Sequence, residues 1–260
     1  MFGRMRVLVV GATGGTGRAI TTRALVEGHT VTAYARRAAE LPSGDGRLQR
    51  VPGDVLDAAA LDAAVRDQDA VICTLGTPPT RSRVSLFSQG TANLVAAMSA
   101  HGVRRIICIT GLGCGNSRGH GGFLYDRVVL PFVLRAIYED KERQEDIIRK
   151  SGLDWIIVRP AFLTNGPSSG NFLALNDLHG VRAGRISRAD VAMFAVRQLV
   201  DGRFLHETPL VTGPTGGLPG EGSVIRGTVP SSAAAAAFIG FIGGVFTAAC
   251  SAIRHGHAGW

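Results

Sequence analysis

Short apolar runs alternate along residues 6–212 with longer segments in which apolar side chains recur at helical spacing. The apolar runs are almost wholly hydrophobic and rich in β-branched residues, reading VLVV, AVIC, IICI and WIIV where they are most uniform. Such runs are typical of parallel strands in a sheet that helices cover on both faces. The predicted strands are Arg6–Val10, His29–Ala35, Arg47–Val51, Asp69–Leu75, Arg104–Thr110, Asp154–Arg159 and Pro209–Thr212.

Helices are predicted between these strands. They are Arg18–Glu27, Asp57–Arg66, Ser85–Ala100, a long region that follows the loop Gly111–Gly122 and ends near Lys150, and Ala189–Val200. Pro131 is expected to break or kink the long region, because proline cannot donate a helical hydrogen bond. Strands that alternate with helices form parallel βαβ units. The sequence therefore predicts an α/β fold with a doubly wound parallel sheet of the Rossmann type, in a single domain over residues 1–213.

The composition changes after Gly213. Residues 214–230 are rich in glycine and proline and are interpreted as a linker. Residues 231–253 form an apolar segment without a charged residue, long enough to span a bilayer as a helix. Two interpretations stay open: a C-terminal membrane anchor, or a low-complexity extension, because many of these residues are weakly apolar Ala or Gly.

Charge and cysteine content narrow the class of partner. The chain has 28 Lys and Arg against 20 Asp and Glu, a formal net charge of +8. The basic residues are scattered and not interleaved with aromatic residues, which argues against nucleic acid and favours an ordinary solvated basic surface. The expected partner is a small-molecule substrate. The four cysteines lack metal-binding spacing, so no metal is predicted and a reduced, cytoplasmic setting is expected. We expect a monomer or small homo-oligomer, attached to the inner face of a membrane if residues 231–253 insert.

A glycine-rich turn follows the first predicted strand and precedes the first predicted helix. The segment G-A-T-G-G-T-G places glycines in the pattern GxxGxxG. The first glycine of such a unit turns the chain sharply, the second lets the backbone approach a pyrophosphate, and the third lets the helix pack on the sheet. The helix N-terminus adds free N–H groups and a positive dipole end. The loop predicts dinucleotide binding, with contacts at Gly11, Thr13, Gly14, Gly15, Thr16 and Gly17.

The end of the second predicted strand indicates which dinucleotide. An acidic residue at this point bonds the ribose 2′-hydroxyl of NAD, whereas arginine side chains clamp the 2′-phosphate of NADP. This chain has Arg36 and Arg37 there. The sequence therefore predicts NADP(H) as the cofactor.

The ends of the next two strands are expected to complete the cofactor crevice, because carboxyl ends of parallel strands share one edge of the sheet. Asp54 and Val55 follow the third strand and are expected beside the adenine. Leu75, Gly76 and Thr77 follow the fourth strand and are expected to wall the nicotinamide side.

Several segments together resemble a known family. They are G-A-T-G-G-T-G, G-D-V-L-D, I-T-G-L-G, D-K-E-R-Q-E and S-G-L-D-W-I-I-V-R-P-A-F-L-T, in order within residues 5–212. This combination resembles the atypical short-chain dehydrogenase/reductases of the NAD(P)H-binding family. That group includes NADPH-dependent flavin and biliverdin reductases and NmrA-like redox sensors. The resemblance implies a single NADP-binding domain that acts on flavins, quinones or related conjugated acceptors, and it leaves the tail without a counterpart.

The chain departs from the usual reacting groups of short-chain dehydrogenases. The usual tyrosine precedes a lysine by four residues, and the lysine lowers its pKa so that the phenol can exchange a proton. Here Tyr138 precedes Lys141 by three residues, and Thr110 ends the fifth strand. In one interpretation Tyr138 and Lys141 form a modified acid pair, together with Thr110. In the other, the acceptor takes its proton from water, and Lys141 holds the nicotinamide ribose beside Thr110 or pairs with Glu145.

Other residues are candidates for substrate contact. His120 lies in the loop after the fifth strand, and Phe162, Leu163 and residues 165–171 follow the sixth. For His120 and Phe162 the alternatives are an ordinary exposed loop residue and ordinary core packing.

Three functions are compatible with these features. The first is an NADPH-dependent oxidoreductase that transfers hydride to a flavin-, biliverdin- or quinone-like acceptor. The second is a non-catalytic sensor of NADP(H), suggested by the altered Tyr–Lys spacing. The third is an enzyme like the sugar-nucleotide epimerases, which is disfavoured because the region after residue 160 is short for a large substrate domain.

Overall fold

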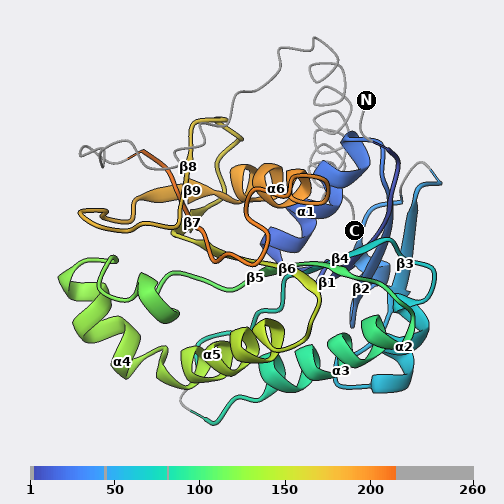
Figure 1. Cartoon of the computed structure of the whole chain (residues 1–260), viewed down its shortest axis with the longest axis horizontal. Coiled ribbons are helices and arrows are strands. Elements are labelled where there is room, and N and C mark those ends of the chain that lie inside the picture. The colour runs from blue at the N-terminus through green and yellow to red at the C-terminus, as the bar shows by residue number, and fades with distance from the viewer. Residues whose placement is uncertain (1–2, 44–45, 81, 215–260) are drawn as a thin grey trace, which may run out of the picture. The chain divides into compact units, whose positions relative to one another are not determined.

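The computed structural model describes residues 3–43, 46–80 and 82–214. An eight-stranded sheet forms its centre, in the order β3-β2-β1-β4-β5-β6-β10-β8 (Figure 1). Its strands are β1 (Arg6–Val10), β2 (Thr30–Ala35), β3 (Leu48–Pro52), β4 (Ala70–Cys73), β5 (Arg105–Ile109), β6 (Asp154–Pro160), β8 (Leu173–Leu175) and β10 (Leu210–Thr212). Only β8 pairs antiparallel in this sheet, so the predicted doubly wound Rossmann-type architecture is confirmed.

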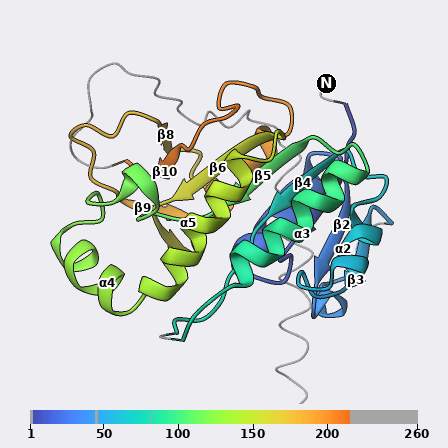
Figure 2. The same cartoon turned by 60° about the horizontal axis from the view of Figure 1, so that its bottom comes forward.

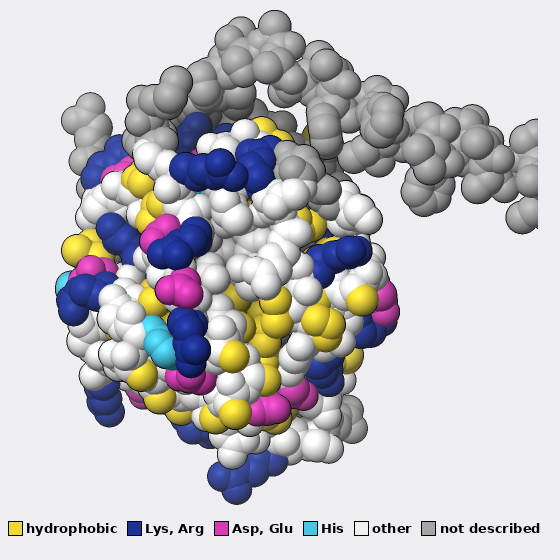
Figure 3. All heavy atoms as spheres, turned by 90° about the vertical axis from the view of Figure 1, so that its right-hand side faces the viewer, with side chains coloured by type: hydrophobic (Ala, Val, Ile, Leu, Met, Phe, Trp, Pro, Cys, Tyr) yellow, Lys and Arg dark blue, Asp and Glu magenta, His cyan; other side chains and the backbone are white. Residues whose placement is uncertain are grey.

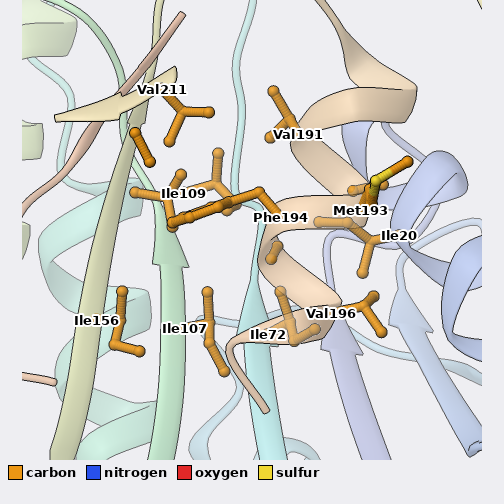
Figure 4. Packing of buried hydrophobic residues seen from close by; sticks show 14 of the residues in the cluster. Ile20, Ile72, Ile107, Ile109, Ile156, Val191, Met193, Phe194, Val196 and Val211 are labelled. Carbon is orange, nitrogen blue, oxygen red and sulfur yellow. The ribbon is translucent and has the colours of Figure 1, made fainter. Parts of the chain in front are cut away.

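Helices cover both faces of the sheet (Figures 1 and 2). On one face lie α1 (Gly15–Val26) and α6 (Arg188–Arg197), and on the other lie α2 (Ala58–Val65), α3 (Leu86–Ala100) and α5 (Arg135–Arg149). Side chains alternate between the two cores, as strand geometry requires: Val9 packs in the cluster of α1 and α6, and Leu8 in the other. Figure 4 shows the first cluster, where Ile72 and Ile107 of the sheet lie opposite Phe194 of α6.

Short elements after β5 and β6 were absent from the sequence prediction. A second, two-stranded parallel sheet pairs β7 (Phe162–Thr164) with β9 (Arg185–Ser187). These strands, like β8, have three residues each, too few for a hydrophobic period to be recognised. The glycine-rich loop after β5 contains a 3-10 turn at Gly115–Ser117.

The expected break at Pro131 is wrong in its position. Helical backbone runs through this residue, as a π-helix over Tyr125–Val129 continued by α4 (Leu130–Phe132), and the break follows at residues 133–134. Pro131 is the second residue of α4, and because it cannot donate a hydrogen bond to the preceding turn, it interrupts the ladder of this helical stretch shortly before the break.

A buried carboxylate joins the start of α6 to the loop after β7. Asp190 accepts hydrogen bonds from the Ser168 hydroxyl (2.7 Å), the Gly170 N–H (2.9 Å) and the Ser187 hydroxyl (2.8 Å). The Ser187 hydroxyl in turn caps α6 by accepting from the Asp190 N–H. The carboxylate thus fixes the position of Arg188, the first residue of α6.

Little of the predicted C-terminal tail is among the described residues. Apart from Pro214, the predicted linker 214–230 and the apolar segment 231–253 lie outside the described residues. None of the helices within the described ranges has the length and apolar character needed to cross a bilayer.

On the described part of the face in Figure 3, Lys and Arg side chains are interspersed with acidic and hydrophobic ones.

A buried ion pair connects β6 with α5. Arg159 and Glu145 are each 1% exposed, and their closest N–O distance is 2.6 Å. Thr110 donates its hydroxyl to the same carboxylate at 2.8 Å, and Arg149 adds a second guanidinium at 2.6 Å. Burial alone would raise the pKa of Glu145, but the hydrogen bonds and charges of these partners bring it below its ordinary value. Glu145 is therefore ionised near neutral pH.

We predict that Glu145→Gln lowers the free energy of unfolding by about 3–5 kcal/mol at pH 7, because it leaves Arg159 buried without its counter-charge. Since the pKa of Glu145 is depressed in the folded protein, this stabilisation is present above the unfolded pKa of about 4.3 and is lost as pH falls through the folded value. Urea denaturation of both proteins from pH 7 to pH 3 measures the difference.

Glu139→Gln is the matched control, on the same helix but exposed and paired with exposed Arg135 at 2.7 Å. Solvent screens that pair, so we expect little change. Equal losses for the two variants would contradict a special role of the buried pair.

Candidate functional site

The strand order reverses between β1 and β4, and open α/β sheets bind ligands outside the carboxyl ends of the strands at such a point. Thr74, directly after β4, joins the two strand ends. Its hydroxyl oxygen lies 2.9 Å from the carbonyl oxygen of Val10 and 3.2 Å from that of Gly11. Gly11 has φ of +80°, and a Cβ there would lie 2.6 Å from the Thr74 carbonyl oxygen. Only glycine fits this turn at the mouth of the crevice.

The other two glycines of the pattern have different roles. A Cβ on Gly17 would lie 2.3 Å from the Gly11 carbonyl oxygen, so this glycine allows α1 to pack closely. Gly14 is exposed, and a Cβ there would meet nothing nearer than 3.4 Å. It is the N-cap of α1, without a side-chain cap, and the first turn of α1 has no acidic residue. Together with half-buried Thr13 and Thr16, the helix start is suited to bind a pyrophosphate.

Arg188 of α6 lies directly over this loop. A Cβ added to Gly15 would be 2.8 Å from the Arg188 Nε. The guanidinium donates to the Asn165 side-chain oxygen at 2.6 Å and has no ion pair among the described residues. It therefore places an uncompensated positive charge beside the phosphate loop. Sequence inspection did not identify Arg188, because the contact joins segments far apart in the chain and no local pattern marks it.

Arg36 and Arg37 lie exposed directly after β2. Arg37 Nη1 is 3.6 Å from a carboxylate oxygen of Glu40. Arg36 has no ion-pair partner within the part of the chain that the structure describes, so its guanidinium is the more available of the two for a phosphate.

The turn after β3 is held by groups that the sequence did not reveal. The Tyr34 hydroxyl donates to the Asp54 carbonyl oxygen at 2.8 Å, and the Asp54 carboxylate accepts the Leu56 N–H at 3.0 Å. The Asn93 side chain donates to the carbonyl of buried Val55 at 3.1 Å. These contacts fix Asp54 and Val55 just after the carboxyl end of β3.

The segment after β4 lies at the same edge of the sheet as the phosphate loop. Leu75 is half-buried and packs against the small apolar cluster of Val84 and Phe87, while Gly76 is exposed and Thr77 half-buried. The backbone at Gly76 is therefore accessible to a ligand on this side.

Lys141 lies at the carboxyl end of β5. Its ammonium donates to the Thr110 carbonyl oxygen at 2.7 Å and stands 4.7 Å from the centre of the Phe87 ring. Burial lowers the pKa of this ammonium. The Thr110 hydroxyl is committed to Glu145, so Thr110 offers the site its backbone rather than a catalytic hydroxyl.

No hydrogen bond joins Tyr138 to Lys141 among the described residues. Its hydroxyl lies 3.0 Å from that of Tyr125, which donates to the Leu112 carbonyl oxygen at 2.8 Å. Burial, together with the neighbouring Tyr125, raises the pKa of the Tyr138 phenol far above its ordinary value. The position four residues before Lys141 is Ile137, a buried residue of the apolar cluster. The hydrogen bonds of the described residues therefore join Lys141 to the Thr110 backbone and Tyr138 to Tyr125, with no direct bond between Tyr138 and Lys141.

Several of the residues predicted to contact substrate make contacts within the protein. His120 Nδ1 lies 2.8 Å from the Val181 carbonyl oxygen, which fixes its ring. Phe162 packs edge-on against Tyr125, with ring centres 5.1 Å apart. Leu163 is exposed, and residues 165–171 adjoin Arg188 through Asn165 and Asp190 through Ser168.

Comparison with known proteins reveals relatives of several kinds. The chain is 33% identical to an uncharacterized chloroplastic protein of Arabidopsis thaliana, over 75% of this chain and 72% of that protein. It is 29% identical to a (4-alkanoyl-5-oxo-2,5-dihydrofuran-3-yl)methyl phosphate reductase of Streptomyces griseus, over 80% and 68% respectively. It is also 28% identical to an uncharacterized Mycobacterium tuberculosis protein, of whose length it spans only 22%.

Solved structures agree with the fold. An anaerobillin reductase, ChuY of Escherichia coli O157:H7, has a TM-score of 0.66 at 25% identity, over 80% of this chain and 97% of that one. A short-chain dehydrogenase/reductase of Veillonella parvula in complex with NADP has a TM-score of 0.68 at 19% identity, over 81% and 95% respectively.

The family follows from a match that covers most of the domain. A family model described as NAD(P)H-binding matches residues 11–202, from the first glycine of the phosphate loop to the end of the segment after α6. The same range contains the crevice, the two arginines after β2 and Arg188. This chain belongs to the NAD(P)H-binding family.

Proposed function

We propose that this protein is an NADPH-dependent reductase that passes hydride to a conjugated, flavin-, biliverdin- or quinone-like acceptor. The observation that carries the proposal is the position of Lys141, which binds the Thr110 backbone and not a tyrosine. A site of this kind binds and orients reactants without an activated protein acid. Conjugated acceptors suit it, because they can take hydride and obtain their proton from water.

The residues of the crevice fit NADP(H) part by part. Gly14, Gly15 and Arg188 would hold the pyrophosphate, and Arg36, assisted by Arg37, would hold the 2′-phosphate. Asp54 and Val55 would contact the adenine, and Lys141 the nicotinamide ribose. When bound, the reduced nicotinamide supplies the hydride.

Two relatives support a reductase. The Streptomyces griseus protein is named as the reductase of a (4-alkanoyl-5-oxo-2,5-dihydrofuran-3-yl)methyl phosphate, and ChuY is described as an anaerobillin reductase. Both names describe reduction of an organic acceptor, the reaction class that we propose for this chain.

A non-catalytic NADP(H) sensor is the second candidate. It is favoured by the raised pKa of Tyr138, because burial that disfavours the phenolate makes this phenol a weaker proton donor. A sensor would bind NADP(H) tightly and oxidise none of it.

We expect NADPH oxidation, followed by absorbance, with at least one acceptor from a panel of FMN, riboflavin, biliverdin and quinones. Tyr138→Phe should keep turnover within about threefold of the unaltered protein, because the phenol has no proton-transfer role. A loss beyond about tenfold would restore the acid role of Tyr138. Tight NADP binding without turnover on the whole panel would favour the sensor.

Two arginine variants distinguish binding of the 2′-phosphate from binding of the pyrophosphate. Arg36→Gln should weaken NADPH about tenfold or more and leave NADH unchanged, because only NADPH carries the 2′-phosphate. Arg188→Gln should weaken both by about the same factor, because both contain the pyrophosphate. Fluorescence titrations with each cofactor measure the four affinities. The assignment of Arg188 is refuted if NADPH binds its variant as tightly as the original protein.

Glycine variants test the loop itself. Gly17→Ala should cost about 1–3 kcal/mol of stability, because its Cβ has no space beside Gly11. Gly14→Ala should leave the melting temperature unchanged and weaken NADPH about tenfold or more, because a methyl group would stand where the pyrophosphate approaches. The opposite pattern, with Gly14→Ala unfolding the protein, would show that Gly14 is structural.

A further inference from the structure

An open pocket of about 500 Å³ lies outside the cofactor crevice. Its walls come from the loop between β4 and α3, from α4 and the residues after it, and from the first half of α5. In Figure 2 both that loop and α4 project away from the sheet on the side of α5. None of the residues expected to bind the cofactor lines this pocket.

Positive charge dominates the polar part of the lining, which contains Arg83, Arg135 and Arg143 against one acidic residue, Glu139. Arg135 is paired with Glu139 at 2.7 Å. Arg143 contacts Asp140 at 3.1 Å, beneath the lining, and donates to the Val84 carbonyl oxygen at 3.1 Å. Arg83 is exposed and has no ion-pair partner among the residues described. The pocket therefore holds a surplus of guanidinium groups, which bind phosphate well.

The apolar part of the lining is open to solvent. Phe132 is 69% exposed and Val133 is 42% exposed, and both line the pocket with Pro131. Large hydrophobic side chains left exposed in a group are typical of a binding surface. A ligand with an apolar body would cover them, and a purely polar anion would not.

One layer of side chains separates this pocket from the crevice. Val84 lines the pocket and belongs to the same apolar cluster as Phe87 and Ile137. Leu75 packs on that cluster, and the Phe87 ring contacts the Lys141 ammonium. A ligand that lies in the pocket is therefore close to the groups expected around the nicotinamide.

We propose that this pocket binds an amphipathic phosphate, with the apolar body on Phe132 and Val133 and the phosphate on Arg83 and Arg135. The surplus of positive charge favours a doubly charged phosphate over a single carboxylate. Because a layer of side chains separates the pocket from the crevice, the pocket is proposed as a second binding site, and hydride transfer takes place in the crevice. Binding itself is independent of turnover and is tested separately.

FMN and riboflavin form a suitable pair of probes, because they share the ring system and differ in the phosphate. Their binding is measured by flavin fluorescence on protein saturated with NADP⁺, which cannot donate hydride. We expect FMN to bind at least about tenfold more tightly than riboflavin, since a guanidinium–phosphate contact contributes this much. Arg83→Gln should reduce FMN affinity at least about fivefold and leave riboflavin within twofold.

Two further variants complete the design. Phe132→Ser should weaken both flavins alike, because it removes apolar contact and no charge. Arg66→Gln is the matched control, an exposed arginine paired with Asp62 at the end of α2 and absent from the pocket lining. It should change neither affinity.

Equal affinities for the two flavins, no binding of either, or equal losses in the Arg83 and Arg66 variants would each overturn the proposal. FMN binding that depends on Arg83 without NADPH oxidation would retain the pocket and reject the reductase.

Discussion

The pairing of Arg159 with Glu145 is the constraint on which this side of the molecule depends. Removing two charges from water is costly, so the surroundings have to supply a hydrogen bond for almost every polar atom of the pair. Thr110 and Asn116 provide two of them. Gly115 accommodates the guanidinium, because a Cβ there would lie 2.5 Å from the Arg159 Nη2. The pair thereby fixes the loop after β5 and the position of α5.

Once α5 is fixed, residues in two adjacent turns of this helix make separate contacts. Asp140 accepts the N–H groups of Phe87 and Ser88 and so caps α3 from another helix. Lys141 turns to the end of β5, and Gln144 donates to Thr91 of α3 at 2.9 Å. Tyr138 lies on the side of the π-helix, with Tyr125.

Most of the sheet and the cofactor loop could be predicted from local patterns. Uniform apolar runs, the glycine spacing and the arginines after β2 are signals within a few residues of each other. Arg188 and Asn93 could not be found in this way, because each acts on a segment that only the folded chain brings near. The short strands β7 and β9 are defined by pairing with each other and not by a hydrophobic period. The pocket beside α4 likewise depends on three separate segments.

The two contacts of Thr110 restrict the amino acid at this position differently. Lys141 donates to the backbone carbonyl of Thr110, which every amino acid supplies, so this contact does not restrict the residue at position 110. Glu145 accepts a hydrogen bond from the side-chain hydroxyl of Thr110, and among other amino acids only Ser would place a hydroxyl at the same point. Sequence divergence at position 110 should therefore alter the buried ion-pair network first, while the lysine keeps its anchor. Related proteins could in this way exchange structural polar groups without losing the groups that meet the cofactor.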